Sequence, residues 1–335
     1  MRILLWHVHG SWTTAFVQGG HEYLVPVLPG RPADGRGRAR TWDWPPAVRE
    51  VGPEELRRAF DAGGVDVVLL QRPHEARLLR EWTGRRAGYD VPAVYLEHDA
   101  PGGPAAATRH PLADVDVVAR GRLPLVHVTG FNALMWDTGQ ARTTVIDHGV
   151  PDPGPRYTGE REHVAAVVNE PVRRWRAAGT DVLLHVASQV PAEVYGMGTP
   201  LLAEHLTARG PTAAAAAGRL ADLPQAELHD RLAGARLYLH PYRWTSLGLA
   251  LLEAMALGLP VLALPVTAAY AAVPPQAGVL SADPDELVAV ARRWLADPAE
   301  AATYGKAARE HVLTHYSLDV FLDRWTTLLN QEVSA

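Results

Sequence analysis

The segment 235–264 constrains the fold more than any other part of the sequence. A strand-like run, 235–239, leads through a polar loop, 240–246, into an apolar helix and then a second strand-like run, 260–264. Strand, loop, helix and strand within about 30 residues predict a βαβ unit, which binds ligands at its loop and helix start. The helix carries a single carboxylate, Glu253, among apolar residues. Because an unpaired buried carboxylate is costly, we expect Glu253 to have a polar partner.

Strand-like runs alternate with helical segments along the whole chain. The runs cover residues 2–8, 65–71, 92–97, 124–129, 164–169, 181–187, 193–196, 235–240, 260–264 and 278–280. This alternation predicts an α/β fold with parallel sheets. A Pro- and Gly-rich segment, 151–155, indicates a domain boundary, so we predict domains at 1–152 and 153–316 and a final helix at 317–335. Residues 30–46, rich in Arg, Gly and Pro, are expected to form a long exposed loop.

Composition and charge exclude several classes of protein. A chain of 335 residues is long enough for two domains, and its net charge of −5 argues against general nucleic-acid binding. No run approaches about 18 apolar residues, so no membrane span is expected. Lys306 is the only lysine, which excludes a phosphate-loop lysine and a Schiff base. The chain has no cysteine and starts inside an expected strand, which leaves no room for a signal peptide, so we expect a cytoplasmic protein.

Polar residues gather where the expected strands end. In the first half these are His7, His9 and Gly10, then Gln71, His74 and Glu75, then Glu97, His98 and Asp99; in the second half they are Asn169, Arg173, Arg174, Gly196, Gly198, His240 and Arg243. Open parallel sheets bind ligands beyond the carboxyl ends of their strands. Imidazoles and carboxylates in one domain, with arginines and Glu253 in the other, suit an enzyme that transfers a group between two substrates.

The second half also carries a specific motif. It consists of Gly248-Leu249, Leu252-Glu253-Ala254-Met255-Ala256, Gly258 and Pro260-Val261, and it continues in 277–285, 287–294, Pro298 and 307–311. This motif resembles the C-terminal half of retaining GT-B glycosyltransferases of the GT4 family. Upstream, 145–150 is similar to the end of that family's first domain, and 1–5 fits its first strand. The resemblance implies an α/β GT-B fold, with two Rossmann-like domains facing across a cleft and a last helix that crosses back to the first domain.

The resemblance implies that the second domain binds a nucleotide-diphosphate sugar. Arg173 falls on the family's diphosphate-binding Arg, but Ala178 falls on its Lys, so Arg174 or Arg176 would supply the second charge. Glu253 matches the carboxylate that accepts hydrogen bonds from the ribose hydroxyls. The alternatives are an ordinary basic cluster on a helix surface for the arginines, and a structural pairing with a nearby Arg for Glu253.

Thr245 is the main departure from the family. The family has a Glu at this position, in contact with the donor sugar, and Ser246 and Leu247 replace its usual Gly and Phe. The backbone amides of Ser246, Leu247 and Gly248 can still hold a sugar or phosphate at the start of the helix. Thr245 can add one hydroxyl contact.

His98 resembles a histidine that in the family lies near the reacting sugar carbon, so it is, with Arg173, our candidate catalytic residue. The alternative is a structural histidine at a strand end. The expected acceptor side consists of His9, Gly10, His74, Glu75 and Glu97, and Gly10 is expected to let backbone approach the ligand. His7 and His9 on one strand face could form a metal pair. However, the family generally needs no metal and the chain has no Asp-x-Asp motif placed to hold one, so we expect neither a metal nor a cofactor.

The resemblance therefore predicts a retaining, metal-independent glycosyltransferase. It would move a sugar from a UDP-, GDP- or ADP-sugar to a small-molecule, glycan or lipid-linked acceptor, with no nucleic acid as partner and membrane contact left open. One alternative is a non-catalytic homologue that binds a nucleotide-sugar or a partner glycosyltransferase; others are an epimerase or a phosphorylase. Trp6, Trp12, Trp42 and Trp44 could stack on an acceptor or belong to the core.

Overall fold

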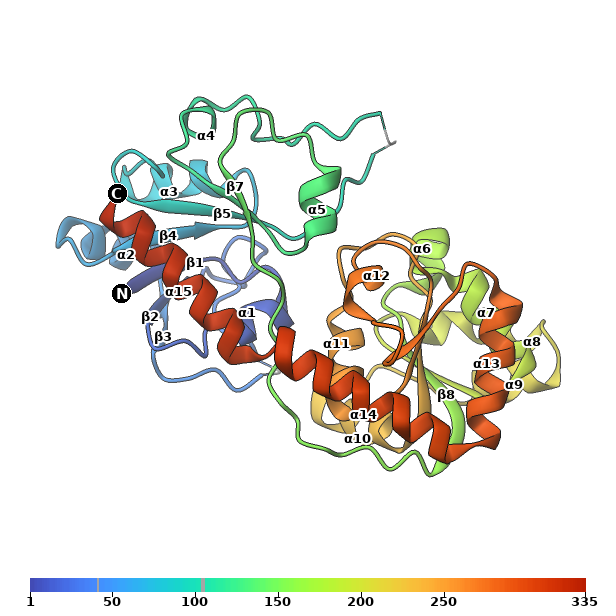
Figure 1. Ribbon diagram of the computed structural model, residues 1–335. Coiled ribbons are helices and arrows are strands. Elements are labelled where there is room, and N and C mark those ends of the chain that lie inside the picture. The colour runs from blue at the N-terminus through green and yellow to red at the C-terminus, as the bar shows by residue number, and fades with distance from the viewer. Residues whose placement is uncertain (41, 104–105) are drawn as a thin grey trace. The chain divides into compact units, whose positions relative to one another are not determined.

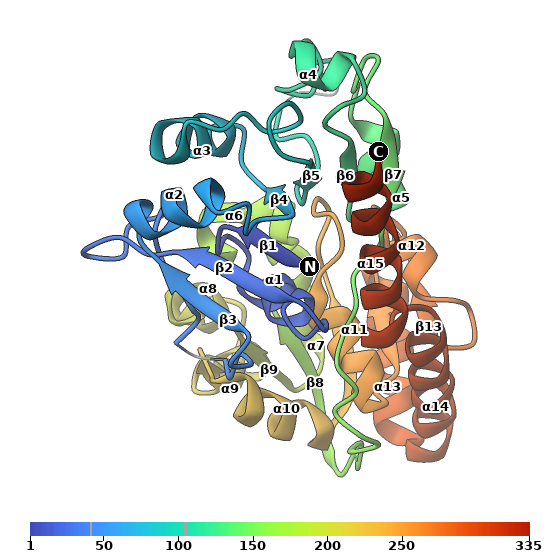
Figure 2. The same cartoon turned by 90° about the vertical axis from the view of Figure 1, so that its left-hand side faces the viewer.

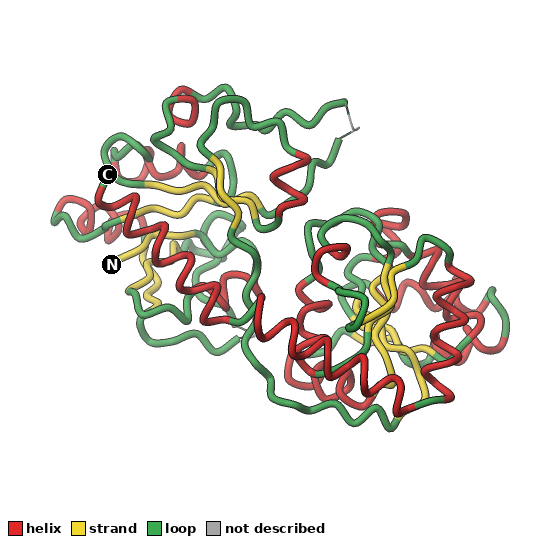
Figure 3. The backbone as a smooth tube through the Cα atoms, viewed as in Figure 1, coloured by secondary structure: helices red, strands yellow, loops and turns green. Residues whose placement is uncertain are grey.

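The computed structural model describes residues 1–40, 42–103 and 106–335 (Figure 1). The chain divides into two compact units: unit 1 is Met1–Gly149 with Leu318–Ala335, and unit 2 is Val150–Ser317. In each unit a parallel sheet lies among helices (Figure 3). This is the α/β architecture that the alternating pattern predicts.

Unit 1 is built on a seven-stranded sheet with the order β3-β2-β1-β4-β5-β6-β7. Its strands are β1 (Arg2–Leu5), β2 (Glu22–Pro26), β3 (Val48–Val51), β4 (Val67–Leu70), β5 (Ala93–Glu97), β6 (Leu125–His127) and β7 (Thr143–Val145). Its helices are α1 (Gly10–Phe16), α2 (Pro53–Asp61), α3 (Glu75–Thr83), α4 (Asp116–Ala119), α5 (Gly130–Met135) and α15 (Leu318–Ser334). From β1 the chain builds β2 and β3 on one side, side by side in Figure 2, and then returns to place β4 on the other side. The strand order therefore reverses between β1 and β4.

Unit 2 is built on a six-stranded sheet with the order β10-β9-β8-β11-β12-β13. Its strands are β8 (Arg161–Val167), β9 (Ala192–Tyr195), β10 (Leu220–Ala221), β11 (Ala235–His240), β12 (Val261–Ala263) and β13 (Gly278–Leu280). Its helices are α6 (Pro171–Ala178), α7 (Thr180–Gln189), the 3-10 helix η1 (Thr199–Leu202), α8 (Ala203–Thr207), α9 (Pro211–Ala217), α10 (Gln225–Gly234), α11 (Leu249–Leu257), α12 (Ala269–Ala272), α13 (Pro284–Ala296) and α14 (Pro298–His315). The elements β11, α11 and β12 form the predicted βαβ unit, and here the strand order reverses between β8 and β11.

The central strands are buried on both faces. All four residues of β4 and all six of β11 are buried, as expected for parallel strands covered by helices on each side. Helix α11 is likewise buried nearly all round, with Leu251, Leu252 and Met255 inaccessible to solvent. The core therefore reaches the strand ends and fixes the loops that follow them.

The last helix, α15, belongs to unit 1. Its Trp325 lies edge-on to Trp12 and Phe16, with ring centroids 5.5 and 5.3 Å apart, and its Glu332 pairs with Arg142 at 2.6 Å. The partners are far apart in sequence, so this helix ties the end of the chain to helix α1 and to the segment before β7.

Two sequence expectations differ from the structure. The expected strand 181–187 is wrong: these residues lie within helix α7. The run is short and mostly buried, but its two polar residues, Asp181 and His185, lie four apart on one partly exposed face of the helix. The loop 30–46 has no regular element among its described residues, but it is exposed only in part. Gly35 and Gly37 are buried, and Arg31 pairs with Glu50 of β3 at 2.7 Å.

Candidate functional site

The predicted donor-side residues follow strands β8 and β11 of unit 2. The strand order of the sheet reverses between these two strands. Arg173 and Arg174 come after β8, and the segment 245–248 comes after β11. Because β8 and β11 are neighbours and run parallel, both segments lie at the same carboxyl edge. This is the place where open α/β sheets bind ligands.

The turn at Gly179 brings these two segments into contact. The amides of Arg243 and Trp244 donate to the carbonyl oxygen of Ala177 at 2.9 and 3.1 Å. Gly179 adopts φ +69°, and a Cβ there would lie 1.7 Å from the carbonyl oxygen of Pro241. Only glycine fits, because any side chain would overlap the neighbouring backbone.

The arginines of α6 differ in how freely they can reach a ligand. Arg173 is 71% exposed, and its Nε donates to Glu170 at 3.2 Å. The guanidinium of Arg174 lies 5.7 Å from the ring centroid of Tyr242. Arg176 instead pairs with Asp181 at 2.6 Å, a carboxylate that also binds Arg243. Because exposed ion pairs are weak, Arg173 can exchange its partner for a phosphate at small cost.

Glu253 is nearly buried and has polar partners, as its place in an apolar helix requires. Its Oε1 accepts from Nε2 of Gln225 at 3.1 Å, and its Oε2 lies 3.4 Å from Nε2 of His229. Both partners lie one turn apart on α10, and neither is the Arg that the structural alternative supposed. The sequence analysis missed them, although their spacing of four on a helix places both on one face.

The loop before α11 packs against the side chain of His240. Ser246 and Leu247 are buried, and a Cβ at Gly248 would lie 2.6 Å from Cε1 of His240. Among the described residues, neither ring nitrogen of His240 has a hydrogen-bond partner, and burial lowers its pKa to about 3. The ring is therefore neutral, and the loop rests on it through packing. Thr245 is half-buried at the start of this loop.

In unit 1 the predicted residues also gather where the strand order reverses. His98, at the end of β5, is buried, and its ring centroid lies 3.9 Å from that of His9, which follows β1. Nε2 of His98 lies 2.8 Å from Oε1 of Gln71, and Nε2 of Gln71 donates to the carbonyl of Trp6 at 2.7 Å. Because Gln71 uses its nitrogen on Trp6, its oxygen faces His98, whose Nε2 must carry the proton. Gln71 thus sets the tautomer of His98, a role that the sequence analysis did not assign.

Burial keeps these imidazoles neutral. Desolvation lowers the pKa of His98 well below its usual value, and the neighbouring His9 and His148 lower it further. Desolvation also lowers the pKa of His9, against the opposing charges of Asp99 and Glu97. A neutral imidazole can donate and accept hydrogen bonds without adding a charge.

The carboxylates of the predicted acceptor side form hydrogen bonds with neighbouring residues at the carboxyl edge of unit 1. Glu75 has no solvent exposure; it accepts from the amide of Gln71 at 2.6 Å and from Arg72 at 2.7 Å, and burial raises its pKa. Glu97 accepts from the amide of Asp99 at 2.8 Å and lies 2.9 Å from Nε2 of His110. Both carboxylates have each oxygen engaged within unit 1, and these bonds hold the ends of β4 and β5 in place.

His74 and Gly10 have different surroundings from the buried carboxylates. His74 is half-exposed and pairs with Asp34 at 2.8 Å. A Cβ at Gly10 would lie 2.4 Å from Cζ3 of Trp42, so what approaches this backbone is an indole and not an open ligand space. Trp6, Trp12 and Trp44 are buried core residues, whereas Trp42 is half-buried.

The histidines do not form a metal site within the described ranges. No group of three or more His, Cys, Asp or Glu side chains is placed there to hold one ion. His7 and His9 have separate surroundings: Nδ1 of His7 lies 3.0 Å from the carbonyl of Gly37, whereas His9 packs on His98.

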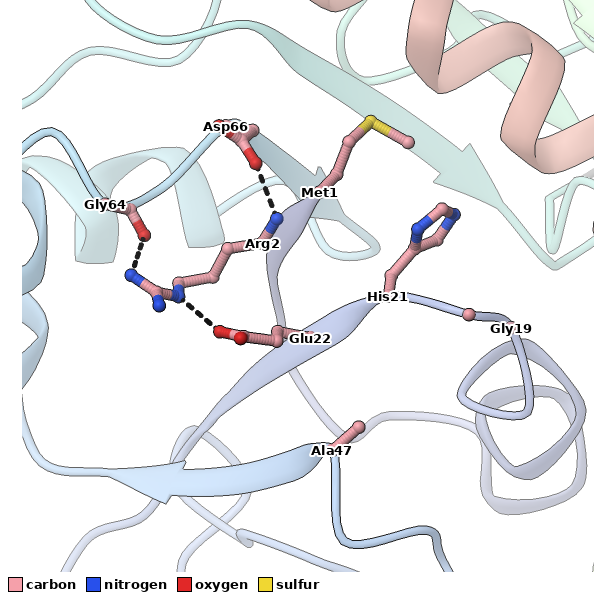
Figure 4. A pocket seen from close by; sticks show the side chains of 9 residues that line it. Met1, Arg2, Gly19, His21, Glu22, Ala47, Gly64 and Asp66 are labelled. Carbon is pink, nitrogen blue, oxygen red and sulfur yellow. Dashed lines mark hydrogen bonds and ion pairs between the residues drawn. The ribbon is translucent and has the colours of Figure 1, made fainter.

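A hollow of about 610 Å³ opens at the opposite edge of the same sheet (Figure 4). There Arg2 donates to Glu22 at 2.8 Å and to the carbonyl of Gly64 at 2.9 Å, while its own amide donates to Asp66 at 2.6 Å. The hollow lies at the amino ends of β1 and β2, away from the predicted residues, so we assign it no role.

Comparisons with known proteins agree with this architecture. The sequence model of a family described as glycosyl transferase-like matches residues 154–329. A search of curated proteins returns no match. In the described part of the chain, no helix is long and apolar enough to cross a membrane.

Solved structures share the fold at low sequence identity. Sucrose-phosphate synthase from Thermosynechococcus elongatus is 17% identical with a TM-score of 0.72, covering 99% of this chain and 98% of that one. Anabaena Alr3699/HepE in complex with UDP is 15% identical with a TM-score of 0.71, covering 99% and 100%. A variant of S. aureus TarM, in complex with Fondaparinux, alpha-GlcNAc-glycerol and UDP, is 14% identical with a TM-score of 0.62. That match covers 79% of this chain, which spans 55% of TarM. These likenesses confirm the GT-B fold that the motif predicts.

Proposed function

Because the chain belongs to the glycosyl transferase-like family, we propose that it is a retaining glycosyltransferase of the GT4 type. It moves a sugar from a nucleotide-diphosphate donor to an acceptor hydroxyl. Unit 2 binds the donor, and unit 1 supplies the acceptor side. The observation that carries the proposal is the carboxyl edge of unit 2, where Arg173, Arg174 and Glu253 come from segments beside the reversal in strand order.

The diphosphate is bound by Arg173 and Arg174. Arg173 keeps most of its side chain in solvent, and Arg174 is held over Tyr242. Two guanidinium groups can neutralise much of the charge of a diphosphate, so we propose transfer without a metal or other cofactor. HepE and TarM hold UDP in their complexes, so UDP-sugars are the first donors to test, followed by GDP- and ADP-sugars.

The ribose is bound by Glu253. A carboxylate offers about four lone-pair directions, and Gln225 and His229 use one on each oxygen. Glu253 can therefore accept two further hydrogen bonds from ribose hydroxyls while both partners hold it in place. Gln225 and His229 are positioning residues in this account.

The donor sugar meets the loop of Thr245, Ser246, Leu247 and Gly248. Backbone amides at this helix start and the Thr245 hydroxyl offer hydrogen bonds without a negative charge. Because a Glu occupies position 245 in the family that this chain resembles, the contact with the donor sugar is weaker here or of different specificity.

The acceptor side contains the neutral imidazoles of His98 and His9. They hydrogen-bond sugar or acceptor hydroxyls, and the departing diphosphate takes the acceptor proton, so no protein nucleophile is needed. Acceptors remain those of a small-molecule, glycan or lipid-linked kind. The absence of cysteine fits the cytoplasmic location that we include in the proposal.

Donor binding tests the proposal first. UDP-, GDP- and ADP-sugars are titrated into the chain and its melting is followed; a true donor at 100 times its Kd adds about 2.7 kcal/mol to the free energy of unfolding. Arg173→Ala should weaken binding, whereas Arg209→Ala, at an exposed arginine in the turn between α8 and α9, should not. A chain that responds to none of these donors contradicts the proposal.

A second candidate function is favoured by Thr245 itself. A GT-B homologue that binds a nucleotide-sugar without turnover would show the same donor binding but no released nucleotide. Free UDP is measured over time in the presence of a donor and a mixture of acceptors. An enzyme releases UDP, and Arg173→Ala abolishes that release, whereas a binding protein releases none.

A further inference from the structure

A hollow of about 660 Å³ at the carboxyl edge of unit 1 is rich in arginine. It is lined by His7, Leu28, Pro29, Gly30, Arg31, Arg36, Arg38 and Arg40. His7 follows β1 and Leu28 follows β2, so the hollow lies at the edge where parallel sheets bind ligands. It is formed by the loop that the sequence analysis singled out for its arginines and left without a function.

Two of the arginines build the wall. Arg31 donates to both oxygens of Glu50, at 2.7 and 3.0 Å, and Arg38 donates through its amide to the same carboxylate at 2.7 Å. The guanidinium of Arg38 also donates to the carbonyl oxygens of Trp44 and Val48. Arg31 adopts φ +50°, a strained backbone for a residue other than glycine, which persists because these bonds hold it.

The other two arginines are exposed. In the described part of the chain, no ion pair involves Arg36 or Arg40. Four arginines thus line the hollow in a chain whose net charge is −5, and two of them, Arg36 and Arg40, keep their charge without an ion pair among the described residues. Arginine forks match phosphate oxygens in geometry as well as in charge.

The hollow is connected to the histidine cluster of the same unit. His7 lines the hollow and lies two residues before His9, which packs on His98. Burial is the main cause of the lowered pKa of His7 and of His9, and the charge of Arg36 acts on both in the same direction. A ligand anchored in the hollow therefore lies beside the residues assigned to the acceptor side.

We propose that this hollow binds a phosphate or diphosphate group carried by the acceptor. Arg36 and Arg40 contact the anion, Arg31 and Arg38 hold the wall, and Leu28 and Pro29 cover the adjoining apolar part of the ligand. The assignment of the ligand as acceptor rests on the proposed function, whereas anion binding in the hollow does not. The acceptor class is then a phosphorylated molecule, either soluble or with its phosphate in a lipid headgroup.

Calorimetric titration with inorganic pyrophosphate tests the binding site directly. The full chain carries Arg173→Ala and Arg174→Ala, which disable the proposed donor site and leave the hollow intact. Adding Arg36→Ala and Arg40→Ala should weaken pyrophosphate binding by about tenfold or more, because each removed contact is a charge-assisted hydrogen bond. The matched control adds Arg58→Ala and Arg80→Ala, two exposed helix arginines of unit 1, and should bind as before.

Failure of this test differs from failure of the proposed function, which is read from donor binding. Equal pyrophosphate affinity in the hollow and control variants, or no binding at all, overturns the inference. Circular dichroism of both variants checks folding; Arg36 and Arg40 make no ion pair among the described residues, so the fold should persist.

The source of the phosphate is distinguished by co-sedimentation with vesicles. Vesicles of phosphatidylcholine with phosphatidylglycerol are compared with vesicles of phosphatidylcholine alone. Sedimentation that needs phosphatidylglycerol, is lost with Arg36→Ala and Arg40→Ala and is blocked by pyrophosphate assigns the anion to a lipid headgroup. Pyrophosphate binding without sedimentation assigns it to a soluble phosphorylated acceptor.

Discussion

The carboxyl edges of the two sheets are built in opposite ways. In unit 2 the edge consists of close backbone turns and an exposed cation: Gly179 allows two loops to touch, and Arg173 is 71% exposed. In unit 1, around His98, the edge consists of buried side chains whose polar atoms are engaged with one another. A diphosphate needs accessible cations and a sugar hydroxyl does not, so the difference fits a donor diphosphate at Arg173 and a hydroxyl beside His98.

A fall in pH should produce the largest difference in stability between the two units. Burial lowers the pKa of His127 and His148 of unit 1 to about 4 and moves that of His98 in the same direction. In unit 2 burial lowers the pKa of His240 to about 3 and also lowers that of His311. Each folded pKa lies below the unfolded value, so the stability is complete above about pH 6.5 and is lost as the pH falls toward the folded pKa.

Between pH 7 and pH 5, His127, His148 and His240 should each lower the free energy of unfolding by about 2 kcal/mol. Urea unfolding at the two pH values, with proteolysis to identify which unit opens, measures this. We expect unit 1 to open first at pH 5. Opening of unit 2 first would show that the buried imidazoles do not dominate the acid response.

A methyl group at Gly179 should destabilise unit 2. In Gly179→Ala the Cβ would overlap the carbonyl of Pro241, and φ +69° would strain the backbone, so we expect a loss of about 3 kcal/mol and of donor binding. The control is Gly154→Ala in the same unit, where φ is +84° but nothing lies within 4 Å of the added carbon. Equal urea midpoints for the two variants would mean that the contact between the loops is not needed.

Removing the charge of Glu253 should weaken the donor without unfolding the chain. Glu253→Gln keeps the shape but loses charge-assisted bonds to ribose, so we expect about tenfold to hundredfold weaker binding by calorimetry. Glu227→Gln, on the exposed face of α10, is the matched control and should bind as the unchanged chain does. If the affinity of Glu253→Gln for the donor is unaltered, Glu253 does not bind the ribose, and its role is limited to its hydrogen bonds with Gln225 and His229.

Gln71→Leu should act on unit 1 alone, and among these changes it should have the smallest effect on donor binding. It leaves Nε2 of His98 without its acceptor and the carbonyl of Trp6 without its donor, at a cost of about 1–3 kcal/mol in stability. We expect a lower kcat with unchanged donor Kd, because His98 loses its fixed tautomer. Gln18→Leu, an exposed glutamine, controls for the substitution. A weaker donor Kd in Gln71→Leu would place this residue in the donor site.

The two edges also differ in how much of them the sequence predicts. Around Glu253 the strand, loop, helix and strand are local, so 30 consecutive residues predict both the βαβ unit and the position of the carboxylate. Its partners Gln225 and His229 lie on another helix, and no local pattern pairs them with it.

In unit 1 the important contacts join distant residues. Gln71 bonds to His98, 27 positions away, and Asp34 bonds to His74, 40 positions away. The strand ends in the sequence therefore predict which edge these residues occupy but not which of them form hydrogen bonds with each other. The strand expected at 181–187 is wrong for another reason: the run is short and mostly apolar, and its only sign of a helix is the spacing of four between Asp181 and His185.

Hydrogen exchange with and without a UDP-sugar tests the central claim most directly. If the donor binds at the carboxyl edge of unit 2, exchange should slow in 168–179 and 240–253 and stay unchanged in 28–40. Slowing in unit 1 in place of unit 2, or no change with any nucleotide-sugar, would contradict the account.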